Sequence, residues 1–206
     1  MPTPAHQPRP AERILAAGTQ PVAAMLLTGT VALYIALVAF GNITDFGTNQ
    51  QFVRHVLSMD TTFKGNGLRW RAVDSTALQD TAYVAIIAWE TLAALTLVAA
   101  TVLWARALRR PAGTPGAYGL RRAQQAGSIG LLMILVLFGV GFIGIGGEWF
   151  AMWQSQAWNG LDAATRVVTL AGIVLVVTHL PSAAGPQAPS ADAPADGLDK
   201  LEKGGS

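Results

Sequence analysis

The chain contains no cysteine and few charged residues. Only 13% of its 206 residues are Asp, Glu, Lys or Arg, about half of the roughly 25% that soluble domains carry. The lack of cysteine excludes disulfides, thiolate metal sites, iron–sulfur ligation and cysteine nucleophiles. The formal net charge is only +2, and no clustered basic face of the kind that binds nucleic acid is present, so we expect no nucleic-acid partner.

Sequence signatures of familiar chemistry are also missing. The chain has no GxxxxGK[S/T] phosphate-binding loop, no GxSxG nucleophile elbow and no HExxH zinc motif. We therefore predict no catalytic residue and no cofactor, and a non-enzymatic protein is favoured over an enzyme.

Long apolar runs are what the chain has in abundance. Hydrophobic residues make up 51% of the sequence, and the mean hydropathy is +0.39. A hydrocarbon core of ~30 Å takes about 20 helical residues to cross, and only helices satisfy their own backbone hydrogen bonds in lipid when the runs are too long for barrel strands. We predict an all-α membrane protein: a four-helix bundle in the lipid bilayer, with structured outer loops and spans at about 22–40, 81–105, 126–145 and 163–180.

The two ends of the chain have a different composition. Residues 1–21 begin with a Pro-rich, polar stretch, which predicts a disordered or interfacial N-terminus before the transmembrane domain of residues 22–180. Residues 181–206 are rich in Ala, Pro, Ser and Asp, which predicts a disordered cytoplasmic tail.

Charge placement predicts the orientation. The second connection contains only basic charges, at Arg106, Arg109, Arg110, Arg121 and Arg122. The first and third connections mix basic residues with the acids Asp45, Asp60, Asp74, Glu148 and Asp162. Because Lys and Arg are enriched in cytoplasmic loops, we expect the second connection and both termini to lie in the cytoplasm.

The two halves of the chain share a weak pattern. Asp45-Phe46 stands at the outer end of the first span and Glu148-Trp149 at the outer end of the third. Each outer loop then ends in Trp-x-x-x-Asp, at Trp70 and at Trp158. The pattern is consistent with a parallel repeat of two hairpins, and equally with the preference of Trp for any membrane interface.

Glu90 is the single charged residue of the second span. A charge at that depth costs ~2.5–3.5 kcal/mol on insertion scales, so the residue is a candidate for handling a proton, an ion or a cofactor. The alternative is a neutral carboxyl that holds helices together. We expect the side chain to face the bundle interior and to be neutral at pH 7 unless a cation or a water-filled cavity lies beside it, with Tyr34 and Thr169 at suitable depths to form hydrogen bonds with it.

The outer loops provide a second set of candidates. Their polar, aromatic and Met residues include Asn42, Asp45, His55, Met59, Asp60, Trp70, Glu148, Trp149, Met152 and Trp158. His55 and Met59 would share a face of a helix, and His, Met and carboxylates could bind a transition metal. The alternative is a folded cap, in which 46–70 and 149–158 pack on each other above the bundle.

Several longer segments carry a family resemblance. They are Asn42–Asn49, Phe52–Phe63, Trp70–Ala72, Ala88–Glu90, Gly146–Ser155 and Trp158–Gly160. In these segments the chain resembles the DUF2165 family of bacterial predicted small integral membrane proteins, over about Val22 to Leu180. The resemblance implies a four-helix membrane protein and assigns no activity to any residue.

Three functions from different classes remain open. The favoured one is a non-enzymatic accessory subunit or assembly factor of a membrane complex, with other membrane subunits or further copies of the chain as partners. A small ion- or proton-coupled transporter that uses Glu90 is the second. A membrane redox protein or enzyme that binds a metal or cofactor through the outer acidic, His and Met groups is the third.

Overall fold

A computed structural model of the chain describes residues 19–65, 67–109 and 117–181. Most of the segments predicted to be disordered, residues 1–18 and 182–206, therefore lie outside the described residues.

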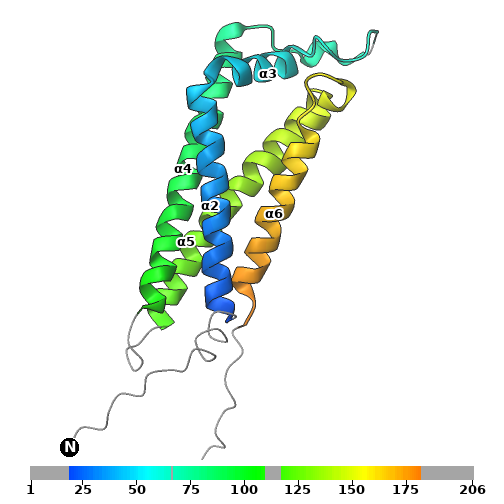
Figure 1. Cartoon of the computed structure of the whole chain (residues 1–206). Coiled ribbons are helices and arrows are strands. Elements are labelled where there is room, and N and C mark those ends of the chain that lie inside the picture. Colours follow the sequence, from blue (N-terminus) through cyan, green and yellow to red (C-terminus); the bar gives the residue numbers. More distant parts are fainter. Residues whose placement is uncertain (1–18, 66, 110–116, 182–206) are drawn as a thin grey trace, which may run out of the picture.

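Four helices are long and apolar enough to cross a membrane, which confirms the predicted bundle (Figure 1). They are α2 (Gln20–Thr44), α4 (Thr76–Leu108), the continuous helix formed by α5 (Ala117–Leu135) and η2 (Val136–Trp149), and α6 (Leu161–His179). Shorter helices lie beyond one end of the bundle: α3 (Phe46–Ser58), η1 (Arg69–Arg71) and η3 (Met152–Gln154). We call segments 45–75 and 150–160 the cap, the end of the bundle beneath them the capped end, and the opposite end the open end.

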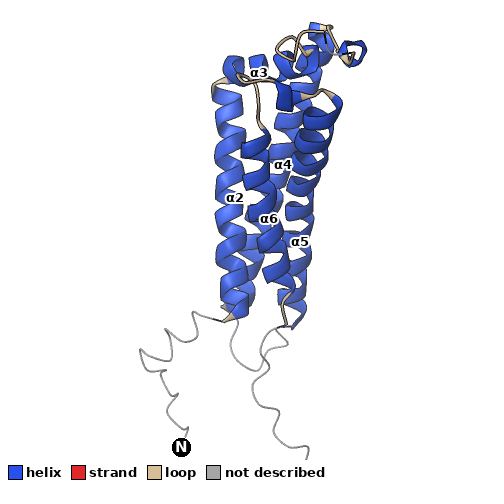
Figure 2. Cartoon of the chain, turned by 90° about the vertical axis from the view of Figure 1, so that its right-hand side faces the viewer, coloured by secondary structure: helices blue, strands red, loops and turns tan. Residues whose placement is uncertain are grey.

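The four long helices form a closed ring around one core. α2 packs on α4, α4 on α5, α5 on α6, and α6 again on α2 (Figure 2). The core is apolar along most of its length, with Val31, Ile35, Leu97, Leu131, Ile134 and Val174 almost fully buried. Small residues let the helices approach closely, as they do in many membrane bundles: Ala24, Thr28 and Ala32 are buried along one stripe of α2.

The third span changes its geometry at mid-length. Its first half, α5, packs on α4, whereas its second half, η2, packs mainly on α6. η2 is a π-helix, in which each turn is wider than in an α-helix. Its sequence holds five glycines, which are poor α-helix formers. The glycine-rich segment therefore widens the helix without breaking it, and α4 and η2 diverge toward the capped end (Figure 1).

Helix ends differ from the predicted span ends at the capped side. α2 continues beyond Phe40 to Thr44, so Asn42 lies within the helix and not in a loop. α3 begins directly after Asp45, which turns the chain across the top of the bundle.

Candidate functional site

Glu90 lies inside the bundle, as the sequence predicted. Its side chain is only 2% exposed, and it shares the buried stripe of α4 with Tyr83 and Leu97, each seven residues or about two helical turns away. No described Lys, Arg or His forms an ion pair with it.

Asn42 is the hydrogen-bond partner of Glu90. Asn42 Nδ2 donates to Glu90 Oε2 over 2.7 Å, and the Tyr83 hydroxyl donates to the carbonyl oxygen of Asn42 over 2.9 Å. The expected partners were therefore wrong. Tyr34 is close to Glu90 but makes no hydrogen bond with it among the described contacts, and Thr169 is exposed because it lies about 200° around α6 from the buried Val167.

A cavity of about 240 Å³ lies beside Glu90. It extends along two helical turns beneath α3, and its polar lining residues are Tyr34, Asn42, Asn49, Tyr83 and Glu90. Most of the remaining wall is apolar, and Phe52, Phe138 and Phe142 add three further aromatic rings. The structure thus places a cavity next to Glu90, and the neutral state of its carboxyl stays a prediction.

The cavity does not continue toward the end of the bundle opposite the cap. Below Glu90 the core consists of side chains such as Val31, Leu97, Leu131 and Ile134, which are all almost fully buried and apolar. The described bundle thus has a cavity at its capped end and a mostly apolar, packed core beneath it.

A second cavity, of about 330 Å³, lies where α4 and η2 diverge. Its lining residues are apolar, from Val56 and Leu57 of α3 to Ile145 and Gly146 of η2. The wall between the two cavities is formed by four residues that line both of them: Phe52, Val53, Ile86 and Phe142. The Glu90 cavity and the apolar cavity therefore lie side by side under the cap and share one wall.

Ionic contacts anchor α3 to the bundle. Arg54 donates to both carboxylate oxygens of Asp80 through Nε and Nη2, over 2.8 and 2.7 Å, and Gln50 Nε2 adds a hydrogen bond of 2.9 Å to the same carboxylate. The hydrogen bond to Asp80 raises the pKa of the Arg54 guanidinium. This bidentate contact holds α3 across α4. Residues of α3 in turn line the Glu90 cavity at the capped end.

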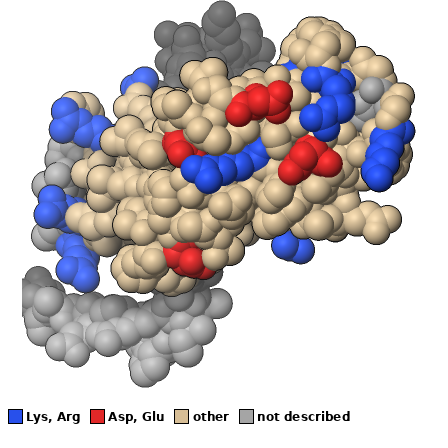
Figure 3. Space-filling view, turned by 90° about the horizontal axis from the view of Figure 1, so that it is seen from above, with Lys and Arg blue, Asp and Glu red and all other residues tan. Residues whose placement is uncertain are grey.

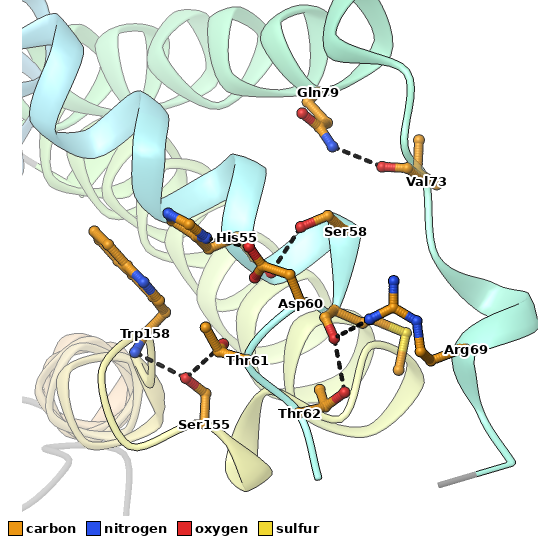
Figure 4. Close-up of polar contacts among 11 residues, drawn as sticks. His55, Ser58, Asp60, Thr61, Thr62, Arg69, Val73, Gln79, Ser155 and Trp158 are labelled. Carbon is orange, nitrogen blue, oxygen red and sulfur yellow. Dashed lines mark hydrogen bonds and ion pairs between the residues drawn. The ribbon is translucent and has the colours of Figure 1, made fainter. Parts of the chain in front are cut away.

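The cap has a small core of its own. Met59, Phe150 and Ala151 are buried together, with Met59 only 1% exposed. Met59 has a left-handed backbone, with φ 53°, and ends α3. Its carbonyl oxygen accepts hydrogen bonds from Arg69 Nη1 and Thr62 Oγ1 (Figure 4). These contacts hold the chain that follows α3 in a fixed course above η2.

Direct hydrogen bonds join the two outer connections. Thr61 Oγ1 donates to Ser155 Oγ over 2.8 Å (Figure 4), and the Phe63 backbone N–H donates to Gln154 Oε1 over 3.0 Å. The Phe63 and Trp153 rings meet edge to face. The prediction that segments 46–70 and 149–158 pack on each other is confirmed.

His55 takes part in the same cap. Its Nδ1 lies 2.6 Å from Asp60 Oδ2, and its ring stacks on Trp158 with the ring centroids 4.5 Å apart. The expected shared face with Met59 does not form, since α3 ends at Ser58 and Met59 is buried in the core of the cap. Within the described part of the chain, no three His, Asp or Glu side chains lie close enough together to hold a metal ion.

At the capped end, four aromatic side chains are exposed by nearly half or more: Phe63 by 57%, Trp70 by 71%, Trp149 by 47% and Trp153 by 49%. We call these four the aromatic face. The Trp70 and Trp149 rings meet edge to face, and the Arg71 guanidinium lies 5.4 Å from the first ring and 4.8 Å from the second. Arg71 also donates to the Trp149 carbonyl over 3.3 Å, so Arg71 contacts both of these exposed residues.

The other predicted outer-loop residues are distributed over the cap. Asp45 is exposed and accepts a hydrogen bond from Thr48 Oγ1 over 2.9 Å. Glu148 is exposed beside Trp149. Met152 is buried, and its sulfur accepts a hydrogen bond from the Gly160 N–H over 3.5 Å.

Sequence reasoning missed three residues that build the site: Arg54, Asp80 and Tyr83. A signal for the cavity was present, because Tyr34, Val38 and Asn42 recur at every fourth position and therefore share one helix face. Tyr83 stands seven residues before Glu90, a spacing of two helical turns on the same face.

Comparison with protein families gives one match. The model of the family described as predicted small integral membrane protein (DUF2165) matches residues 20–181, which include all four spans and the whole cap. No curated protein matches the chain, and no solved structure matches it.

Proposed function

The chain belongs to the DUF2165 family of predicted small integral membrane proteins, and from this premise we propose that it acts as a non-enzymatic accessory subunit or assembly factor of a membrane complex. The aromatic face carries this proposal. Exposed apolar patches with a polar surround are typical of protein contact sites, and Trp and Arg are enriched where such contacts are strongest.

The rigidity of the cap supports the proposal. A partner that binds an ordered surface loses less free energy to the ordering of side chains than one that binds mobile loops. Arg71 holds Trp70 and Trp149, and hydrogen bonds across the two connections hold Phe63 and Trp153. The aromatic face thus has a fixed shape before any partner binds.

We further propose that the capped end faces outward from the inner membrane of a bacterium. At the open end, Arg106, Arg109, Arg121 and Arg122 have no acidic residue beside them in the sequence. At the capped end, basic and acidic side chains are interspersed (Figure 3). The positive-inside tendency therefore favours a cytoplasmic open end.

Quantitative co-purification tests the subunit proposal. The tagged chain is extracted with its surrounding lipid, and the proteins recovered with it are measured for wild type, for Trp70→Ala/Trp149→Ala and for Leu92→Ala/Leu95→Ala. Leu92 and Leu95 are exposed on the apolar surface of α4 and serve as the matched control. We expect a stoichiometric partner with wild type and the control, and its loss with the Trp pair. Recovery of the wild-type chain alone would contradict the proposal.

The Glu90 cavity favours a second candidate function, ion- or proton-coupled transport. A buried carboxyl beside a cavity is the feature that such a function requires, but the apolar core below Glu90 means that a path would need a second copy or a large rearrangement. Transport that is fully retained by Glu90→Gln in proteoliposomes would remove the basis for this candidate.

A further inference from the structure

The Glu90 cavity combines one buried carboxyl with an aromatic wall. Glu90 lines the cavity and is 2% exposed, and only its Oε2 has a hydrogen-bond partner, Asn42. Its Oε1 forms no hydrogen bond with any described residue. This oxygen can accept a hydrogen bond from a donor that enters the cavity, and this indicates the chemistry of what could bind.

From this arrangement we propose that the cavity binds a small organic ammonium ion, with the ammonium group at Glu90. The charged nitrogen would donate to Glu90 Oε1, which forms a charge-assisted hydrogen bond in a low-dielectric setting. The positive charge of the ligand also balances the carboxylate, for which the described spans provide no ion-pair partner.

The aromatic lining favours an organic cation over a metal ion. Tyr34, Phe52, Tyr83, Phe138 and Phe142 all line the cavity. Ring faces attract ammonium groups, and aromatic cages are a recurring way to recognise them. A hard metal cation instead takes six or more oxygen ligands, whereas one carboxylate and two Asn side chains are the main oxygen ligands here.

The size of the cavity sets the size of the ligand. A cavity of ~150 Å³ can hold benzene, so the 240 Å³ beside Glu90 accommodates an aromatic ring with a short aminoalkyl arm. The apolar body of such a molecule would contact Phe138, Phe142 and Val167, while Asn49 of α3 covers it from the capped end. This proposal concerns residues inside the bundle and is independent of the aromatic face, so either can fail without the other.

Calorimetric titration of the full chain in lipid nanodiscs tests the proposal. The probe is 2-phenylethylammonium, and the matched neutral probe is 2-phenylethanol. We expect the wild type to bind the ammonium at least tenfold more tightly than the alcohol, and Glu90→Gln to lose that preference. Glu148→Gln, which neutralises an exposed glutamate at the same end of the bundle, should behave as wild type. No binding of the ammonium by wild type, or unchanged binding by Glu90→Gln, would overturn the proposal.

Two further experiments distinguish a loss of binding from a loss of folding, and an organic ammonium site from an inorganic cation site. If Glu90→Gln fails to fold, Ala163→Phe fills the cavity from α6 and should also abolish ammonium binding. Competition by sodium chloride at the concentration of the probe would show an inorganic cation site and would overturn the proposal. Equal affinity for the alcohol and the ammonium would overturn it as well.

Discussion

At the scale of single residues, the pair formed by Glu90 and Asn42 determines the character of the bundle interior. The two side chains come from α4 and α2 and meet in a core that is otherwise mostly apolar. Tyr83 adds a second link between the same two helices, through the backbone carbonyl oxygen of Asn42. A polar contact of this kind costs free energy if it is left incomplete, so its integrity can be measured through stability.

We predict that Asn42→Ala destabilises the folded protein by about 1–3 kcal/mol, because it leaves a buried carboxyl oxygen without its donor. The loss should shrink in a Glu90→Ala background, since the partner is then absent. Thermal unfolding of the two single variants and the double variant measures this coupling. Gln51→Ala, at an exposed position of α3, is the control and should change stability by less than about 0.5 kcal/mol. Additive effects of Asn42→Ala and Glu90→Ala would contradict the pairing.

The sequence was sufficient to place Glu90 but not its partner. A lone carboxylate in an apolar run must face the interior, because lipid does not solvate it. Hydropathy alone places Asn42 in the outer loop because the apolar run ends at Phe40, yet α2 continues for another turn to Thr44. Within this turn Asn42 contacts Glu90 and Tyr83, and single-sequence hydropathy does not contain these tertiary contacts.

At the scale of elements, close helix contact depends on small residues. A Cβ atom added at Gly130 of α5 would lie 2.6 Å from Leu97 Cγ of α4. Gly172 of α6 has no atom within 4 Å of the equivalent position. A methyl group therefore fits at Gly172 but would clash with Leu97 at Gly130.

We predict that Gly130→Ala lowers stability by about 1–3 kcal/mol, because it forces α4 and α5 apart in a packed core. Gly172→Ala should be neutral or stabilising by about 0.5–1 kcal/mol, as alanine is the better helix former. Thermal unfolding in one detergent compares the two. Addition of Leu97→Ala to Gly130→Ala should recover part of the lost stability, and equal effects of the two glycine changes would show that α4 and α5 are not in contact at Gly130.

The cap is the second feature at this scale, and the absence of cysteine makes it easy to test. Thr61 and Ser155 come from the two outer connections, and their hydroxyl oxygens are 2.8 Å apart. We predict that Thr61→Cys/Ser155→Cys forms a disulfide readily in the membrane, detected as a change in gel mobility that reductant reverses. Thr61→Cys/Ser128→Cys, with Ser128 on α5 near the open end, should form none. Slow or absent oxidation of the first pair would show that the connections move freely.

The sequence predicted that the two connections pack together, because so many aromatic residues need burial. It did not predict α3 as a helix that crosses the bundle, nor the π-helix of η2. Both depend on long-range contacts: Arg54 with Asp80 holds α3 in place, and η2 leaves α4 to pack on α6. Helical periodicity reports which residues share a face, but not where two helices diverge.

At the scale of the whole molecule, the two ends of the bundle differ in charge and in structure. One end has the cap and both cavities beneath it, and the other has the arginine-rich connection. We predict that reporter fusions at Pro111 and at the C-terminus both give cytoplasmic signals, because short basic loops stay inside. A periplasmic signal at Pro111 would invert the orientation and place the aromatic face in the cytoplasm.

The proposal that the aromatic face binds a protein partner is tested most directly by photocross-linking in living cells. A benzophenone amino acid is placed at Trp70 in the cap, and, in a separate strain, at Leu95 on the apolar surface of α4. Irradiation should give one discrete protein adduct from position 70 and none of that mass from position 95. If position 70 gives no protein adduct, or only adducts with lipid, while the chain is present at its normal level, the aromatic face does not bind a protein and the account of this molecule as a complex subunit is wrong.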